Sequence, residues 1–348
     1  ANSNTAVGTN ALFTNTTGAT NTALGNGAMF ANTTGSNNVG IGKNSLDTNT
    51  TGGSNVAMGR DALTSNTTAS LNTGVGDCAL QANTTGDINA AFGAYALKVN
   101  TTGSANTAVG KNSLLANTTA GSNTAVGYNS LSANTTGVNN TAVGQGALQA
   151  NTTANENTAF GMSALRLNTT GVFNTAVGLN AADANTTGQK HTAIGYAALG
   201  AATTGEDNTA LGYQSVVAAT TGSCNTGLGR SAGDNTTTGD NNISLGYAGR
   251  PSSATVSDEI TLGNADNNNL RCADTSISTL SDLRDKTNVE DIPHGLDYIL
   301  AMRPVKFDWN TRDGSRIGKK DYGFIAQELD KVETDFDSAE YTRLVHKE

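Results

Sequence analysis

Hydrophobic and polar positions recur along this chain in strict register, with the same pattern returning at every seventeenth position. A pattern close to N-T-A-V-G-x-N-A-L-x-A-N-T-T-G-x-x describes each unit, and no insertion interrupts the copies. A flexible linker gains nothing from keeping such a register, whereas stacked coils lose their side-chain ladders when one residue slips. The pattern therefore predicts a β-solenoid with one copy per coil. The sixteen copies begin at Asn4, Asn21, Asn38, Asn55, Asn72, Asn89, Asn106, Asn123, Asn140, Asn157, Asn174, His191, Asn208, Asn225, Asn242 and Glu259.

Stacking turns each position of the repeat, numbered from 1 at Asn4, into a column of side chains. Alternation in Thr-Ala-Val predicts a short strand with Thr outward and Ala inward, and Asn-Thr-Thr-Gly predicts a turn. Gly at position 5, as in Gly8, marks a turn that needs positive φ or close backbone approach. The Asn column at position 12, which starts at Asn15, is expected to form a ladder of side-chain amides. Apolar residues form two columns, one through Val7, Leu24, Ile41, Met58, Val75 and Phe92 and the other through Leu12, Met29, Leu46, Leu63, Leu80 and Leu97.

Each coil contains only two sizeable apolar side chains. They do not stabilise a lone coil against an ordering cost of roughly 1–2 kcal/mol per residue. We therefore expect the two apolar columns to face one another across a symmetry axis, with trimerisation supplying the missing burial. Sixteen coils at a spacing of about 4.8 Å predict a rod of roughly 75 Å.

The recurring N-T-A-V-G-x-x-A-L of residues 4–263 resembles the head repeats of trimeric autotransporter adhesins of the YadA type. The resemblance implies a trimer of left-handed parallel β-rolls. The fold class expected for the chain is accordingly all-β: a trimeric parallel β-roll or β-solenoid, followed by a small α+β domain.

The amino-acid composition changes after the repeats. More than half of the charged residues of the chain, and its single Trp, lie in residues 281–348. This composition predicts three parts: a repetitive shaft over 1–263, a neck or linker over 264–280, and a small conventional domain over 281–348. Within that domain the pattern predicts a helix over 296–302, a strand over 305–309, and a strand passing into a helix over 322–329.

Three motifs of this domain occur in a recognisable order: Ser281-Asp282-Leu283-Arg284-Asp285-Lys286, then Leu300-x-x-Arg303-Pro304-Val305-x-Phe307, then Gly323-Phe324-Ile325-Ala326-Gln327-Glu328. Together they resemble the intramolecular chaperone auto-processing domain that ends many phage tail spikes and fibres, including endosialidases. The resemblance implies that the domain templates trimer assembly and then cuts itself off before Ser281, at the Leu280–Ser281 bond. That family continues into a long C-terminal helix, so we expect the domain to extend beyond Glu348.

The resemblance also assigns a Ser–Lys pair, Ser281 and Lys286, to the cleavage. A Ser hydroxyl is a weak nucleophile and needs a nearby base, and a Lys serves as that base when burial or neighbouring charge lowers its pKa. Residues five apart face different ways on a strand or a helix, so a bend or a partner subunit must bring the pair together. Asp282 and Arg284 are expected to orient the pair. Such chemistry is at most a single-turnover autoproteolysis, with no external substrate.

Composition narrows the other possibilities. The net charge of −9 argues against nucleic acid, and no apolar stretch approaches the roughly 20 residues that span a bilayer. The three cysteines, Cys78, Cys224 and Cys272, are expected to be free thiols, and the three histidines form no ligand cluster. No metal and no cofactor is expected. Gly110-Lys111-Asn112-Ser113 imitates a phosphate-binding loop but is an ordinary copy of the repeat.

These observations predict a homotrimeric phage tail fibre, located in the virion and extracellular after release. Its expected partners are its own copies, a glycan or protein receptor on the host cell, and other tail proteins through a region preceding Ala1. A bacterial trimeric surface adhesin is the alternative. A glycan-cleaving enzyme, with carboxylates such as Glu156, and an ice-binding protein, with its Thr columns, are further alternatives.

Overall fold

The computed structural model describes residues 3–267, 295–308 and 320–336. Internal contacts divide the chain into two units, residues 1–270 and 271–348, and each is described by itself. The residues of the predicted cleavage site, Leu280, Ser281, Asp282, Arg284 and Lys286, lie outside the described residues. So does most of the predicted neck.

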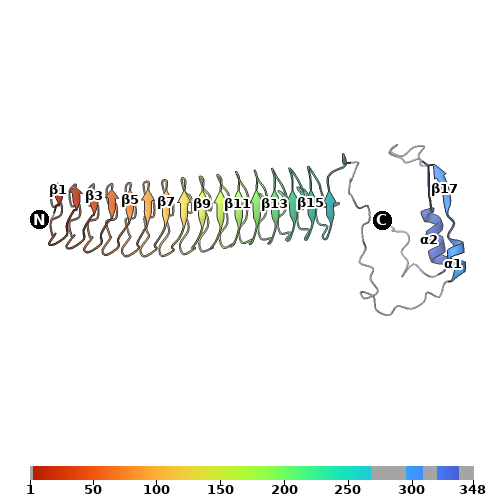
Figure 1. Ribbon diagram of the computed structural model, residues 1–348, viewed down its shortest axis with the longest axis horizontal. Helices are drawn as coiled ribbons and strands as arrows, with labels where there is room; N and C mark the ends of the chain where they lie inside the picture. Colours follow the sequence, from red (N-terminus) through yellow and green to blue (C-terminus); the bar gives the residue numbers. More distant parts are fainter. Residues whose placement is uncertain (1–2, 268–294, 309–319, 337–348) are drawn as a thin grey trace. The chain divides into compact units, whose positions relative to one another are not determined.

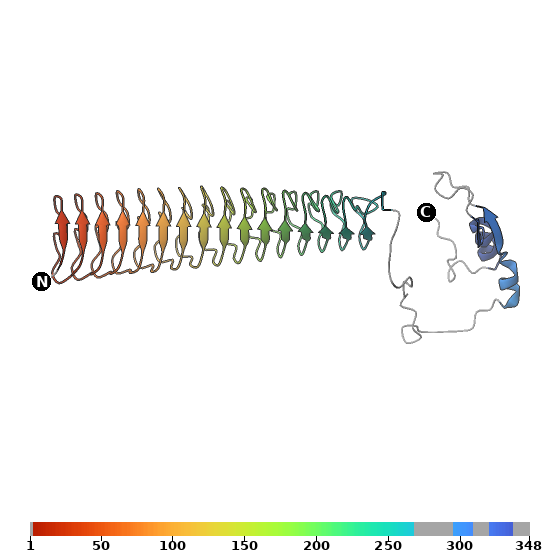
Figure 2. The same ribbon diagram turned by 45° about the horizontal axis from the view of Figure 1, so that its top comes forward.

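The first unit is a parallel β-solenoid with one short strand per repeat (Figures 1 and 2). Each strand pairs in parallel with the strand of the next copy, and the register pairs Thr5 with Thr22, one full repeat further along. The predicted solenoid is confirmed. Its strands are β1 Thr5–Val7, β2 Thr22–Leu24, β3 Val39–Ile41, β4 Val56–Met58, β5 Thr73–Val75, β6 Ala90–Phe92, β7 Thr107–Val109, β8 Thr124–Val126, β9 Thr141–Val143, β10 Thr158–Phe160, β11 Thr175–Val177, β12 Thr192–Ile194, β13 Thr209–Leu211, β14 Thr226–Leu228, β15 Ile243–Leu245 and β16 Ile260–Leu262.

The core of the solenoid is a narrow column inside each chain. The Ala at the middle of a strand, such as Ala108, and the Leu at position 9, such as Leu114, are both fully buried. The expectation that both apolar columns face a symmetry axis is therefore wrong for the Leu column. It packs on the Ala side chains of its own coil and of adjacent coils, so its burial needs no partner. Small Ala side chains make this possible, because they let the coil close tightly around one large residue.

Each coil contains several left-handed backbone positions. The Leu at position 9 has positive φ in most copies, for example 49° at Leu114, and positions 7 and 17 do so as well. This conformation costs a residue with a Cβ roughly 1–2 kcal/mol. Hydrogen bonds between coils offset the cost, since the amide of Leu114 donates to the carbonyl of Ser130 in the next copy at 3.1 Å.

Glycine at position 5 meets both expected conditions. Gly110 has φ +123°, and a Cβ built on it would lie 2.6 Å from the carbonyl oxygen of Gly127 in the next copy. The coils therefore touch backbone to backbone at this turn.

Two asparagine ladders run along the solenoid. At position 12, Asn49 Nδ2 donates to Asn32 Oδ1 at 2.7 Å and to the carbonyl of Gly52 at 3.0 Å. At position 1, the Oδ1 of Asn21 accepts from the backbone N–H of Asn38 at 2.9 Å. These side chains are fully buried, and the ladders supply the hydrogen bonds that buried amides require. The predicted ladder at position 12 is confirmed.

The described part of the second unit holds two helices and a small sheet: α1 Leu296–Ala301, β17 Val305–Asp308, β18 Lys320–Gly323 and α2 Ala326–Asp335. Strands β17 and β18 are antiparallel, with Val305 opposite Gly323. The rings of Tyr298 in α1 and Phe336 after α2 meet edge to face at 5.3 Å. The order helix, strand, strand, helix is the one that the sequence predicts.

Candidate functional site

The described residues of the second unit bring together two of the three C-terminal motifs. Arg303, between α1 and β17, donates through Nε to Glu328 Oε2 at 3.0 Å, and its Nη2 donates to the other carboxylate oxygen. Glu328 lies in the first turn of α2, at the end of the Gly323–Glu328 motif. The pair therefore ties the loop after α1 to the start of α2, although the two residues are far apart in the sequence.

The opposite charges of Arg303 and Glu328 attract one another and shift the pKa of both groups. The Arg303 guanidinium holds the pKa of the Glu328 carboxyl below its usual range, and Glu328 raises the pKa of Arg303. A bidentate Arg–carboxylate contact adds directional specificity to the attraction. Both residues belong to motifs recognised in the sequence, but their pairing was not predicted, because sequence spacing alone does not place a loop beside the start of a later helix.

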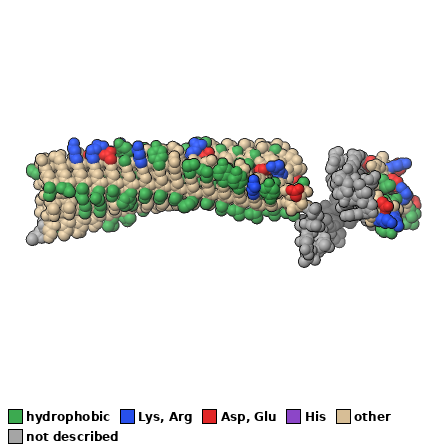
Figure 3. All heavy atoms as spheres, turned by 90° about the horizontal axis from the view of Figure 1, so that it is seen from above, with side chains coloured by type: hydrophobic (Ala, Val, Ile, Leu, Met, Phe, Trp, Pro, Cys, Tyr) green, Lys and Arg blue, Asp and Glu red, His purple; other side chains and the backbone are tan. Residues whose placement is uncertain are grey.

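On the shaft, the apolar column at position 4 is at least partly exposed in every copy. Every member projects from the solvent-facing side of its strand, and none is fully buried. Exposed fractions reach 56% at Val7 and Phe160. Figure 3 shows hydrophobic side chains forming a row along the shaft. Members at least 36% exposed are Val7, Leu24, Met58, Phe92, Val109, Phe160, Leu211, Leu228 and Leu262.

Such a row is unusual for a surface that stays in contact with water. Scattered exposed apolar residues are normal, whereas a contiguous stripe marks a surface for association. This column is open to a partner, whereas the Leu column is already enclosed.

Several charged side chains on the shaft form ion pairs between neighbouring copies. Arg60 contacts Asp77 at 2.8 Å, and Arg166 contacts Asp183 at 2.8 Å, so each pair joins one copy to the next. Exposed pairs of this kind contribute little to stability. Their spacing of one repeat follows from the stacking of the coils and gives no indication of a catalytic site.

His191 occupies the place of asparagine in the position 1 ladder and is almost completely buried. Its Nδ1 accepts from the backbone N–H of Asn208 at 3.3 Å, while its Nε2 makes no hydrogen bond to a described residue. Burial lowers the pKa of His191 to about 4, against the opposing influence of the Gly205 backbone and Asp207. The imidazole is therefore neutral and structural at pH 7.

The remaining candidates find no site in the described parts of the chain. Cys78 and Cys224 are free thiols, and Cys272 lies outside the described residues together with the other two histidines. Lys111 follows Gly110 in an ordinary coil. Within residues 3–267, 295–308 and 320–336, no cluster of His, Cys, Asp or Glu is suited to a metal ion, and no helix has the length and apolar character to cross a bilayer.

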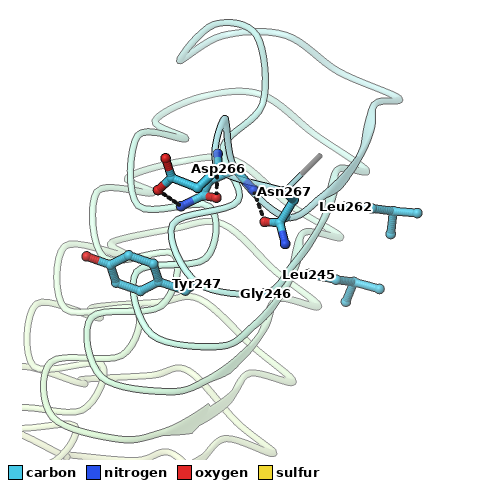
Figure 4. A pocket seen from close by; sticks show the side chains of 8 residues that line it. Leu245, Gly246, Tyr247, Leu262, Asp266 and Asn267 are labelled. Atoms are coloured by element: carbon cyan, nitrogen blue, oxygen red, sulfur yellow. Dashed lines mark hydrogen bonds between the residues drawn. The ribbon is translucent and has the colours of Figure 1, made fainter. Parts of the chain in front are cut away.

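The end of the solenoid next to β16 is hollowed, as Figure 4 shows. Leu245 and Leu262, both at position 4, project to one side of the coil, and the ring of Tyr247 lies on the other side of Gly246. Asn264 closes the last turn, since its backbone N–H donates to Asn267 Oδ1 at 2.8 Å and its Oδ1 accepts from the N–H of Asp266 at 3.1 Å. The apolar column and the Tyr247 surface are therefore different faces of the shaft.

Comparison with protein families matches residues 281–339 to the family described as the chaperone of endosialidase. The match begins at Ser281 and includes both segments joined by the Arg303–Glu328 pair. Neither the curated proteins nor the solved structures gave a significant match to the chain. The chain thus combines a β-solenoid with a C-terminal segment similar to the chaperone of endosialidase, a combination that suggests a tail-fibre-like protein.

Proposed function

We propose that this chain is the shaft and C-terminal chaperone of a homotrimeric bacteriophage tail fibre, structural and receptor-facing. The C-terminal segment templates the trimer and then cleaves the Leu280–Ser281 bond, with Ser281 as nucleophile and Lys286 as its base. The mature fibre belongs to the virion. It contacts a glycan or protein receptor on the host cell, and other tail proteins bind through a region preceding the shaft.

The observation that carries the proposal is the succession of a long, regular solenoid and a chaperone-type segment in one chain. Nearly identical copies leave the alignment of three chains weakly specified, because a shift by one whole copy preserves almost every local contact. Repeat proteins are accordingly prone to misassembly. A domain that aligns three chains at one end solves this problem, and it is dispensable once the register is set.

The exposed position 4 column supports the trimeric part of the proposal. Three copies that bring this column together bury apolar side chains that a single chain leaves in water. The column runs through all sixteen strands, so the contact extends along the entire shaft.

Autoproteolysis is tested by expressing the full chain beside Ser281→Ala and Lys286→Ala. The wild type is expected to separate on a denaturing gel into a shaft fragment and a fragment starting at Ser281, as identified by N-terminal sequencing. Both variants are expected to remain one band, because one lacks the nucleophile and the other its base.

Asp285→Asn serves as the matched control within the same motif and is expected to be cut like the wild type. A wild-type chain that stays intact under native assembly conditions, or a Ser281→Ala chain that is cut at the same bond, contradicts the assigned chemistry.

A further inference from the structure

The outer surface of the shaft changes character along position 6 of the repeat. In the first seven copies this position holds Thr, Asn, Lys, Arg, Asp and Ala, whereas several later copies place large flat side chains there. We call Tyr196, Tyr213, Arg230 and Tyr247, which occupy four successive copies, the tyrosine stripe. Figure 3 shows a broader hydrophobic patch over part of the C-terminal half of the shaft.

The members of the tyrosine stripe are stacked on one another. The rings of Tyr196 and Tyr213 lie 5.0 Å apart with an interplanar angle of 14°. The Arg230 guanidinium lies 5.6 Å from the ring centre of Tyr213 and 5.5 Å from that of Tyr247. Four planar groups therefore form one continuous ladder.

This ladder remains open to solvent. The three tyrosines are 41%, 46% and 58% exposed, and Arg230 is exposed as well. Arg230 forms no ion pair with a described carboxylate, and the three tyrosine hydroxyls form no hydrogen bond to another described residue. Folding of the coil does not need these side chains, since earlier copies adopt the same coil with Asn26 or Lys43 at position 6.

We propose that the tyrosine stripe is a binding site for a polysaccharide strand, an inference that rests on the receptor-facing function proposed above. A pyranose ring presents one flat face of C–H groups and a rim of hydroxyls. Tyrosine provides a rigid flat surface with a polar tip, and Arg provides five donors in a planar fork. The regular spacing of the ladder suits a polymer whose rings recur along the same direction.

Other occupants fit this surface less well. Nucleic acid bases also stack on tyrosines, but their phosphates require clustered cations, and the chain has a net charge of −9. A second copy of the chain is expected on the position 4 column, which lies on another side of the coil at Leu245 and Leu262 (Figure 4). Arg250, paired with Asp234 beside Tyr247, adds donors and acceptors suited to sugar hydroxyls.

The test is binding of the full chain to an immobilised panel of purified bacterial capsular polysaccharides and O-antigens, with neutral and acidic polymers included. The wild type is expected to bind at least one polymer. Tyr213→Ala and Arg230→Gln are each expected to raise the Kd for that polymer by about tenfold or more. A preference for acidic or neutral polymers then assigns the Arg230 contact to acid groups or to hydroxyls.

Tyr128→Ala is the matched control, because Tyr128 occupies the same position of the repeat and is 48% exposed but lies outside the stripe. Its binding is expected to equal that of the wild type. Absence of binding to the whole panel, or undiminished binding by Tyr213→Ala, overturns the inference. Oligomeric state and cleavage, measured on the same samples, show separately whether the proposed tail-fibre function fails.

Discussion

At the scale of single residues, His191 replaces asparagine in the position 1 ladder, and this replacement has a measurable consequence. Above pH 6.5 the imidazole is neutral in both the folded and the unfolded chain. As the pH falls from 6.5 to about 4, the unfolded chain binds a proton that the folded chain does not, because burial lowers the pKa of His191 to about 4. Stability is therefore lost across this window, by up to about 3 kcal/mol.

We expect the His191→Asn variant to lose less stability than the wild type as the pH falls from 6.5 to about 4. Asparagine restores the ladder consensus and has no proton to bind. Thermal unfolding of both proteins at pH 7 and at about pH 4.5 is the measurement, and the wild type is expected to show the larger drop in Tm. Equal drops in Tm for the two proteins would show that His191 does not have the lowered pKa that its burial implies.

Some of the residue-scale features of the shaft could be predicted from the sequence, and others could not. The Asn ladder and the Gly turns were predictable, because each residue type has few physical reasons to recur in strict register. The left-handed conformation of the position 9 leucines was not predictable, since Leu has no intrinsic preference for positive φ and adopts it here only under the constraint of the neighbouring coils.

At the scale of the coil, two glycines predict opposite outcomes. Gly110 cannot hold a Cβ, which would lie 2.6 Å from the carbonyl oxygen of Gly127 at a φ of +123°. Gly110→Ala is therefore expected to lower the stability of the shaft by about 3 kcal/mol or more. Gly146 has φ +66°, and Asn129 adopts φ 56° at the same position of another copy. Gly146→Asn is accordingly expected to change stability by less than about 0.5 kcal/mol.

Denaturant unfolding of the two variants beside the wild type measures the difference. Similar losses in both would mean that the close approach of the coils at position 5 relaxes easily. The same contrast explains why Gly occupies position 5 in every copy of this chain, whereas position 7 accepts Asn, Asp, Cys and Tyr.

At the scale of the whole molecule, the prediction concerns association through the position 4 column. Phe92→Asp combined with Phe160→Asp places carboxylates on this column, and three copies would bring those charges together in an apolar contact. Like charges in such a contact are strongly unfavourable. The variant is expected to lose the trimer, as measured by light scattering after size exclusion.

Thr153→Asp adds a carboxylate at an exposed position of the same shaft outside the strands, and it is expected to leave the trimer intact. A wild-type chain that is monomeric in solution, or a double variant that remains trimeric, removes the basis of the fibre proposal.

The sequence by itself determined the solenoid, its period and register, and the order of elements in the C-terminal domain. Strict periodicity needs no long-range information, because each copy meets the same neighbours. Only the tertiary structure decided which apolar column is enclosed and which is exposed, since both read alike as apolar positions until the coil closes around the Leu side chain. Likewise, the tyrosine stripe and the Arg303–Glu328 pair exist only in space, because residues distant in the sequence become neighbours when the chain folds.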